Sequence, residues 1–349
     1  MHILATSTAF PAHYYSQGEV VEALLAFWGD DARIGATLER LHLRTGVDGR
    51  YFSRRLEEYR SLDTWGKVNN TWIAVAEELG ERAIDCALKQ AGLPREAIGA
   101  IFFVSVTGVA SPSIDARLVN RMCLSPNIRR NPIFGLGCVA GAAGLARAAD
   151  YVRAYPDQVA ALLSVELCSL TWQREDLSMA NLISSGLFGD GAAAVLVGGE
   201  KVSGRGPRIV ASHCVFYPDT EDVMGWDISE QGFRIVLSPD VPKVVRENLG
   251  RDVDGFLAGQ GLTRSDIGSW IMHTGGPKVL EATAQSLGLT RDELEVSWDA
   301  LRRVGNLSSA SVLVVLDEVV KHRRPAPGTR SILAAMGPGF CAEMLLLEW

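Results

Sequence analysis

The sequence contains a cysteine, a histidine and an asparagine whose surroundings would suit nucleophilic acyl chemistry. Cys138 follows a short apolar run, residues 133–136, and precedes an alanine-rich segment that reaches Asp150. This pattern predicts a strand, a tight turn and a helix, with Cys138 at the helix N-terminus. The helix dipole favours a thiolate there, and the free N–H groups can bind an oxyanion. Four glycines leave room for a thin acyl substrate: Gly135, Gly137, Gly141 and Gly144.

His273 and Asn306 stand at comparable places in the second half of the chain. His273 follows a predicted apolar strand, residues 270–272, and Asn306 follows Gly305 and opens a predicted helix. A histidine can hold a cysteine as a thiolate by becoming an imidazolium. Histidine and asparagine side chains together can donate hydrogen bonds to a carbonyl or enolate oxygen. Either residue alone is more often structural, but three such residues at equivalent turns favour a catalytic site.

Other interpretations of the Cys138 stretch stay open. A lone cysteine is often a buried core residue. The spacing of Gly135, Gly137 and Ala140 fits the loose dinucleotide-binding pattern, although Asp157, the acidic residue at the matching distance, precedes the next strand instead of ending it. A papain-like hydrolase also uses cysteine, histidine and asparagine, but the local sequence typical of its cysteine is missing here.

An internal duplication would bring these residues together. Residues 92–101 resemble residues 261–270, the pair Gly137-Cys138 corresponds to Gly305-Asn306, and the strand at 159–165 corresponds to 331–335. In each copy a long helix precedes an apolar strand, which is typical of an α/β unit. Two facing copies would place the Cys138 and Asn306 turns next to each other, with His273 at a strand end where α/β folds bind ligands.

Further elements follow from periodicity and turn residues. Helices are predicted at residues 19–27, 70–91 and 115–123, and strands at 98–106, 159–167 and 192–197. Residues 198–207 are rich in glycine and proline and predict a linker between the two copies. The basic and aromatic stretch at 38–52 is interpreted as a solvated, partly helical surface segment.

Composition excludes several functional classes. The chain has 349 residues, 47% of them hydrophobic, which is enough for two domains or one large duplicated domain. Its net charge of −7 and the absence of a basic block argue against nucleic acid as a partner. No apolar run is long enough for a membrane span, and no secretion signal is apparent. The six cysteines stand singly, so no metal and no disulfide framework are expected, and we predict a cytoplasmic protein.

Five motifs resemble those of the type III polyketide synthases, the chalcone synthase-like branch of the thiolase superfamily. They are residues 135–141 (GLGCVAG), 186–192 (GLFGDGA), 273–277 (HTGGP), 305–310 (GNLSSA) and 336–339 (MGPG), so the resemblance covers essentially the whole chain. It implies an α/β protein with a thiolase-like, five-layered αβαβα fold from two duplicated halves. Residues 1–203 would carry the nucleophilic cysteine, and residues 204–349 the histidine and asparagine.

The resemblance also implies the reaction. A homodimer would condense malonyl-CoA repeatedly onto an acyl-CoA starter, without a carrier protein and without a cofactor beyond these CoA thioesters. Cys138 would take the starter acyl group. His273 and Asn306 would stabilise the enolate that remains when malonyl-CoA loses CO2.

Several residues match the family's substrate-binding positions. Phe188 matches the phenylalanine that gates the CoA tunnel, and Arg40 and Arg44 match cations that hold CoA phosphates, whereas Thr37 stands at a third basic position. The remaining residues expected to contact substrate are Thr107, Ser111, Cys168, Thr171, Ile235, Gly276 and Ser308. The loop 108–112, which contains Ser111, is expected to reach the partner subunit.

The small residues beside the nucleophile, Cys168 among them, resemble members with a tunnel for long acyl chains. We therefore expect a medium- or long-chain fatty acyl starter and an alkylpyrone or alkylresorcinol product. The alternative within the family is a tetrahydroxynaphthalene-type synthase that uses malonyl-CoA only. A ketoacyl-ACP synthase of fatty-acid type shares the cysteine, histidine and asparagine but would need a basic docking patch. A thiolase-fold interaction protein without activity is disfavoured because all three residues are present.

Overall fold

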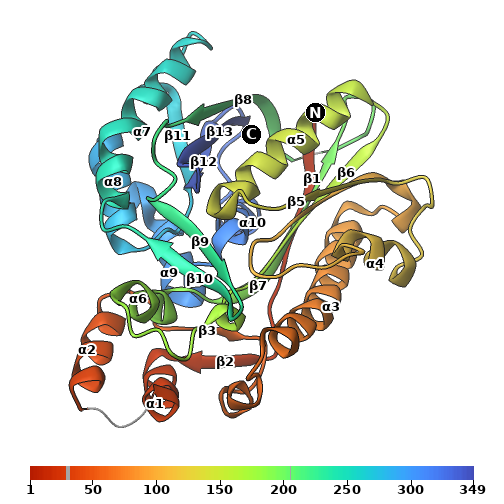
Figure 1. Cartoon of the computed structure of the whole chain (residues 1–349). Helices are drawn as coiled ribbons and strands as arrows, with labels where there is room; N and C mark the ends of the chain where they lie inside the picture. The colour runs from red at the N-terminus through yellow and green to blue at the C-terminus, as the bar shows by residue number, and fades with distance from the viewer. Residues whose placement is uncertain (29–31, 205) are drawn as a thin grey trace.

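The computed structural model describes residues 1–28, 32–204 and 206–349 (Figure 1). Its main sheet consists of β1 (His2–Ala9), β4 (Ile98–Val104), β5 (Arg129–Ile133), β6 (Val159–Leu167), β7 (Asp190–Gly198), β8 (Arg208–Phe216), β11 (Ile267–Met272), β12 (Arg330–Gly337) and β13 (Cys341–Glu348). These strands lie in the order β11-β12-β13-β8-β1-β7-β6-β4-β5. Two small antiparallel pairs flank it: β2 (His13–Ser16) with β3 (Gly49–Phe52), and β9 (Met224–Ser229) with β10 (Gly232–Leu237).

The helices are distributed over both halves of the chain. The first half contains α1 (Gln17–Trp28), α2 (Ala32–Leu43), α3 (Trp65–Ala91), α4 (Ile114–Arg121), α5 (Ala140–Ala154) and α6 (Met179–Leu187). The second half contains α7 (Val241–Ala258), α8 (Pro277–Leu287), α9 (Glu295–Val304) and α10 (Ser311–His322).

The sheet repeats one pairing pattern on either side of its centre. In the first half, β4 runs parallel to β6, β6 antiparallel to β7, and β7 antiparallel to β1. In the second half, β11 runs parallel to β12, β12 antiparallel to β13, and β13 antiparallel to β8. The halves join where the Ile3 N–H donates to the Pro207 carbonyl, beside the β1–β8 pairing. The predicted duplication is confirmed, and β5 is an extra strand of the first half.

Three hydrophobic clusters produce five layers. The central cluster packs α5 and α10 between the two halves of the sheet, with Leu162 on one side and Leu333 on the other. Leu163, the neighbour of Leu162, points to the opposite face and packs against α3 and α4. A third cluster packs α7 and α8 against the outer face of the second half, around Ile332. The resulting αβαβα order was predicted, and Figure 1 shows α3 and α4 on the side opposite α7 and α8.

Helix α3 starts five residues earlier than its apolar periodicity indicates. The Thr64 side chain accepts a hydrogen bond from the Lys67 N–H and caps the helix before its first buried turn. At the other end Gly92 adopts a left-handed conformation, with φ of 66°, and ends the helix as predicted. Boundaries set by capping are therefore less visible in the hydrophobic pattern than those set by glycine.

The stretch at 38–52 is not the solvated surface segment that the sequence analysis expects. It forms the end of α2, a turn and β3, and four of its polar or aromatic side chains are buried: His42, Thr45, Arg50 and Phe52. The basic composition suggests a solvated segment, but the Arg50 side chain is buried and donates hydrogen bonds to two carbonyl oxygens of α6.

Within residues 1–28, 32–204 and 206–349, no helix is both long and apolar enough to cross a membrane. The same ranges contain no cluster of histidine, cysteine and carboxylate side chains that could hold a metal ion.

Candidate active site

Cys138 lies in a short 3-10 turn, residues Gly137–Val139, that leads directly into α5. Gly137 makes this turn possible because its φ is 53° and a Cβ at this position would lie 2.5 Å from the Pro338 ring. The Cys138 side chain is buried, and its Sγ lies 3.6 Å from the Ser308 hydroxyl. The predicted turn at the helix N-terminus is thus present, closed on one side by the second half of the chain.

Asn306 occupies the equivalent turn before α10, after Gly305 with φ of 75°. Its Oδ1 accepts hydrogen bonds from the Ser308 N–H at 2.8 Å and from the Ser311 hydroxyl at 3.2 Å. These two bonds fix the amide so that Nδ2 is the group left to donate. Because Ser308 also contacts Cys138, the two turns meet, as the duplication predicts.

His273 follows β11 and is held by its backbone N–H, which donates to the Ala334 carbonyl at 3.0 Å. Its ring is 8% exposed, and Nδ1 has no hydrogen-bond partner among the described residues. Burial lowers the pKa of His273 to about 4. The imidazole is therefore neutral near pH 7 and carries one N–H donor and one acceptor.

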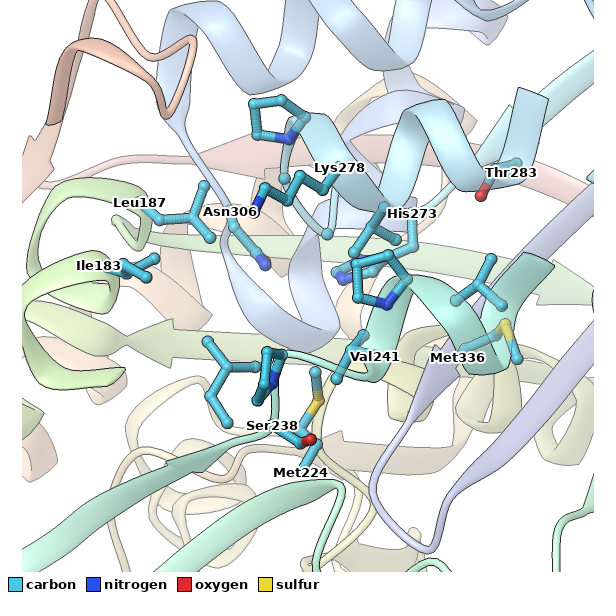
Figure 2. A pocket seen from close by; sticks show the side chains of 18 of the residues that line it. Ile183, Leu187, Met224, Ser238, Val241, His273, Lys278, Thr283, Asn306 and Met336 are labelled. Atoms are coloured by element: carbon cyan, nitrogen blue, oxygen red, sulfur yellow. The ribbon is translucent and has the colours of Figure 1, made fainter. Parts of the chain in front are cut away.

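His273 and Asn306 line one cavity of about 410 Å³ (Figure 2). Three residues that are expected to contact substrate line it as well: Phe188, Gly276 and Arg44. Its remaining lining is largely apolar. Cys138 is not among the described residues that line this cavity, and its sulfur lies next to Ser308.

Burial also raises the pKa of Cys138 to about 12, although the hydrogen bond with Ser308 lowers it in part. Burial therefore opposes the thiolate that the helix N-terminus favours, and it favours the neutral form of His273. The expected thiolate stays a prediction.

Glu166, which the sequence analysis missed, lies fully buried on β6 near Cys138. Its carboxyl group accepts hydrogen bonds from the Val106 N–H at 3.1 Å, the Thr107 hydroxyl at 2.9 Å and the Ser309 hydroxyl. Burial raises the pKa of Glu166 to about 7 in spite of these donors. A lone acidic residue inside the apolar run of β6 was the only signal in the sequence.

The motif at residues 186–192 holds Asn306 through its backbone. The Asn306 N–H donates to the Leu187 carbonyl at 2.9 Å, and the Gly189 N–H donates to the Asn306 carbonyl at 3.0 Å. Arg50 fixes the same segment by donating to the carbonyls of Ser185 and Gly186. Asp190, at the end of the motif, accepts hydrogen bonds from the backbone N–H groups of Ser53 and Ser169. Phe188 and Asn306 are thus positioned together.

The other predicted substrate residues are scattered. Thr107 lines a second cavity of about 700 Å³, whereas Ser111, Cys168, Thr171, Ile235 and Ser308 line neither cavity. Arg40 is exposed on α2 and also lies outside both linings. The second cavity carries seven charged side chains: Asp63, Arg174, Glu175, Asp176, Asp227, Glu230 and Arg234. Of the small residues expected to form a tunnel beside Cys168, Thr107 is the one that lines either of these two cavities.

Comparisons with known proteins agree with this arrangement. Residues 1–201 match the N-terminal domain of chalcone and stilbene synthases, and residues 208–348 match the C-terminal domain. The chain is 48% identical to a 1,3,6,8-tetrahydroxynaphthalene synthase of Streptomyces peucetius subsp. caesius, covering 99% of this chain and 93% of that protein. It is 37% identical to a putative chalcone synthase of Bacillus subtilis, covering 99% and 98%. The crystal structure of 1,3,6,8-tetrahydroxynaphthalene synthase from Streptomyces coelicolor A3(2), a bacterial type III polyketide synthase, superposes with a TM-score of 0.95 at 32% identity, covering 100% of this chain and 99% of that one.

Proposed function

We propose that this chain, which belongs to the chalcone and stilbene synthase family of type III polyketide synthases, is a tetrahydroxynaphthalene-type synthase that uses malonyl-CoA both as starter and as extender. The observation that carries this proposal is the 48% identity to a 1,3,6,8-tetrahydroxynaphthalene synthase over 99% of the chain. The TM-score of 0.95 with a second synthase of the same name supports it. The substrates would be CoA thioesters, with no further cofactor.

The long-chain acyl starter that the sequence analysis favours is not supported. The cavity lined by Thr107 carries seven charged side chains beside apolar ones such as Trp65 and Leu170. An alkyl chain gains about 0.8 kcal/mol per buried CH2 only where it leaves water for apolar surroundings. Displacing water from charged side chains would offset that gain. A short, polar malonyl-derived chain is compatible with such walls, which favours the alternative reading.

Acyl transfer to Cys138 would begin from the neutral site. As Sγ forms its bond to the thioester carbonyl carbon of malonyl-CoA, the thiol proton passes to the neutral imidazole of His273. The bond between that carbon and the CoA sulfur breaks, and the departing CoA thiolate takes the proton back.

Extension would use the two donors in the cavity. When a second malonyl-CoA loses CO2, negative charge develops on its thioester oxygen, and Nδ2 of Asn306 with an N–H of His273 can donate to that oxygen. The enolate carbon then attacks the Cys138 thioester, a carbon–carbon bond forms, and the carbon–sulfur bond to Cys138 breaks. The extended chain is then carried by the CoA of the second malonyl-CoA, and Cys138, released as a thiolate, is free to take the chain back for another cycle.

A homodimer belongs to the proposal because the loop 108–112 is expected to reach a partner subunit. Val109 on this loop is 37% exposed, and Phe134, which precedes the Cys138 turn, is 50% exposed. Exposed large apolar side chains of this kind are common at subunit interfaces. Light scattering at micromolar concentration should give twice the chain mass. A monomer would contradict the proposed dimer but not the proposed reaction.

Products formed from malonyl-CoA alone test the proposed function. Purified protein should convert malonyl-CoA into an aromatic product with the mass of tetrahydroxynaphthalene or its oxidised form, detected by mass spectrometry. Addition of acetyl-, hexanoyl- or lauroyl-CoA should leave that product dominant. The Cys138→Ala variant, which lacks the nucleophile, is the control. The proposal would be overturned by a protein that is silent with malonyl-CoA alone and makes alkylpyrones once lauroyl-CoA is added.

A further inference from the structure

The Gln17 side chain, which has no part in the reaction described above, connects α1 to three other segments. Gln17 opens α1, and its backbone N–H donates to the Asp48 carbonyl at 2.8 Å, which fixes the residue beside β3. Its side-chain Nε2 lies 2.8 Å from the Gly186 carbonyl oxygen and 2.9 Å from the Thr45 hydroxyl oxygen. Its Oε1 accepts a hydrogen bond from Arg50. Figure 1 shows α1, α2 and α6 together at one side of the molecule.

The hydrogen bonds of this amide fix its orientation. An amide nitrogen carries two hydrogens, and the two shortest of the three contacts of Nε2 account for both. The Thr45 hydroxyl donates its own hydrogen to the His42 carbonyl at 2.7 Å, so its oxygen can accept from Gln17. Nε2 therefore faces Gly186, and Oε1 faces Arg50. A side chain held in this way keeps the segments that it joins at a constant separation.

The Gly186 carbonyl precedes the residue that binds the backbone of Asn306. The Leu187 carbonyl accepts a hydrogen bond from the Asn306 N–H at 2.9 Å, and Gln17 donates to the residue directly before Leu187. On its other side Gln17 bonds to Thr45, which lines the cavity that contains Asn306. Gln17 itself is not among the described residues that line this cavity. It thus joins one wall of the cavity to the segment that holds the proposed oxyanion donor.

We propose that Gln17 is a positioning residue for the decarboxylation of malonyl-CoA, which acts through Gly186 and Leu187 on Asn306. An oxyanion donor stabilises developing charge only when it is aimed at the oxygen, so a small displacement of its support is costly. The assignment rests on the proposed role of Asn306 and not on the identity of the product. A wild-type protein that made another product would contradict the proposed function and leave this assignment untouched.

Two variants remove the donors of Gln17. Gln17→Leu removes the whole amide, whereas Gln17→Glu keeps its volume and the acceptor for Arg50. In both variants kcat for the release of acetyl-CoA from malonyl-CoA should fall about fivefold to tenfold per folded molecule, the value of one neutral hydrogen bond. Urea unfolding gives the folded fraction of each protein. KM, and the loading of Cys138 by an acyl-CoA, should stay within about twofold of wild type, because neither the nucleophile nor a cavity-lining residue is replaced.

Gln158→Leu is the matched control. Gln158 is also half-buried, and its Oε1 accepts a hydrogen bond from the Tyr151 hydroxyl, between α5 and β6. It is not among the described residues that line either cavity. A general cost of losing a half-buried amide would lower kcat in both variants, whereas positioning of Asn306 would lower it in the Gln17 variants and leave Gln158→Leu like wild type.

Combination with Asn306→Asp separates positioning of the donor from a role in the fold. In that background the donor is already absent, so Gln17→Leu should change the residual rate by less than about twofold. A role in the fold alone would lower the rate by the same factor in both backgrounds. The proposal is overturned if Gln17→Leu decarboxylates malonyl-CoA within about twofold of wild type, if its effect persists beside Asn306→Asp, or if KM rises while kcat stays constant.

Discussion

Replacing Asn306 by aspartate would test the assigned oxyanion donor with little disturbance of the fold. Oδ1 of Asn306 accepts from the Ser308 N–H and the Ser311 hydroxyl, and an aspartate oxygen can accept both bonds in the same place. The substitution exchanges only Nδ2 for a second oxygen. The site therefore keeps its shape and loses one donor to the enolate.

The expected loss follows from that single donor. Removing one oxyanion-hole donor costs about 2.7–4 kcal/mol, or about 100- to 1,000-fold in kcat. Asn306→Asp should lie at the upper end because a carboxylate would repel the enolate. Release of acetyl-CoA from malonyl-CoA, followed by chromatography, measures decarboxylation alone. Loading of Cys138 by an acyl-CoA, followed by intact-protein mass spectrometry, should change far less.

Ser311→Ala supplies a graded comparison, since it removes one of the two bonds that orient Asn306 and leaves the amide in place. Its decarboxylation rate should fall by about tenfold or less, the value of one neutral hydrogen bond. The reasoning would be refuted if Asn306→Asp decarboxylated malonyl-CoA within about threefold of wild type, or if its loading of Cys138 failed while decarboxylation remained.

Two further predictions concern the buried polar groups around the site. Burial raises the pKa of Glu166 from 4.5 to about 7 in the folded protein. The contribution of Glu166 to the free energy of unfolding is therefore fully present below about pH 4.5 and is lost as pH rises through 7. Between pH 4.5 and 8, the free energy of unfolding measured with urea should fall by about 3 kcal/mol more for wild type than for Glu166→Gln, at about 1.4 kcal/mol per pKa unit. Parallel pH profiles of the two proteins would contradict this prediction. Arg50→Met should lower the free energy of unfolding by about 3 kcal/mol, because it leaves the carbonyls of Ser185 and Gly186 without donors. It should also reduce kcat beyond the unfolded fraction, since the same segment holds Asn306; an unchanged kcat per folded molecule would refute the coupling.

The turns that carry Cys138 and Asn306 could be predicted from sequence because their signals are local. Gly137 and Gly305 both adopt positive φ, and each lies shortly before a segment whose composition is typical of a helix. The duplication could be predicted equally well, because its two copies share motifs at the same relative positions. The five layers followed from the family resemblance.

The residues that prediction missed depend on contacts between distant segments. Arg50 is buried only because the end of α6 lies across β3. Glu166 is satisfied by donors from two other segments, which only the folded chain brings together. The ionisation of Cys138 depends on such contacts as well. The helix N-terminus is a local feature, whereas burial raises the pKa of Cys138 and the Ser308 hydroxyl, from the other half of the chain, lowers it.

The most direct test of the account is to follow every carbon of the product. The protein is incubated with uniformly 13C-labelled malonyl-CoA and an excess of unlabelled lauroyl-CoA, and both the product and the peptide that contains Cys138 are analysed by mass spectrometry. The account predicts an aromatic product in which every carbon is labelled, and a fully labelled acyl adduct on Cys138. An unlabelled alkyl chain in the product, or an adduct on another cysteine with Cys138 free, would contradict it.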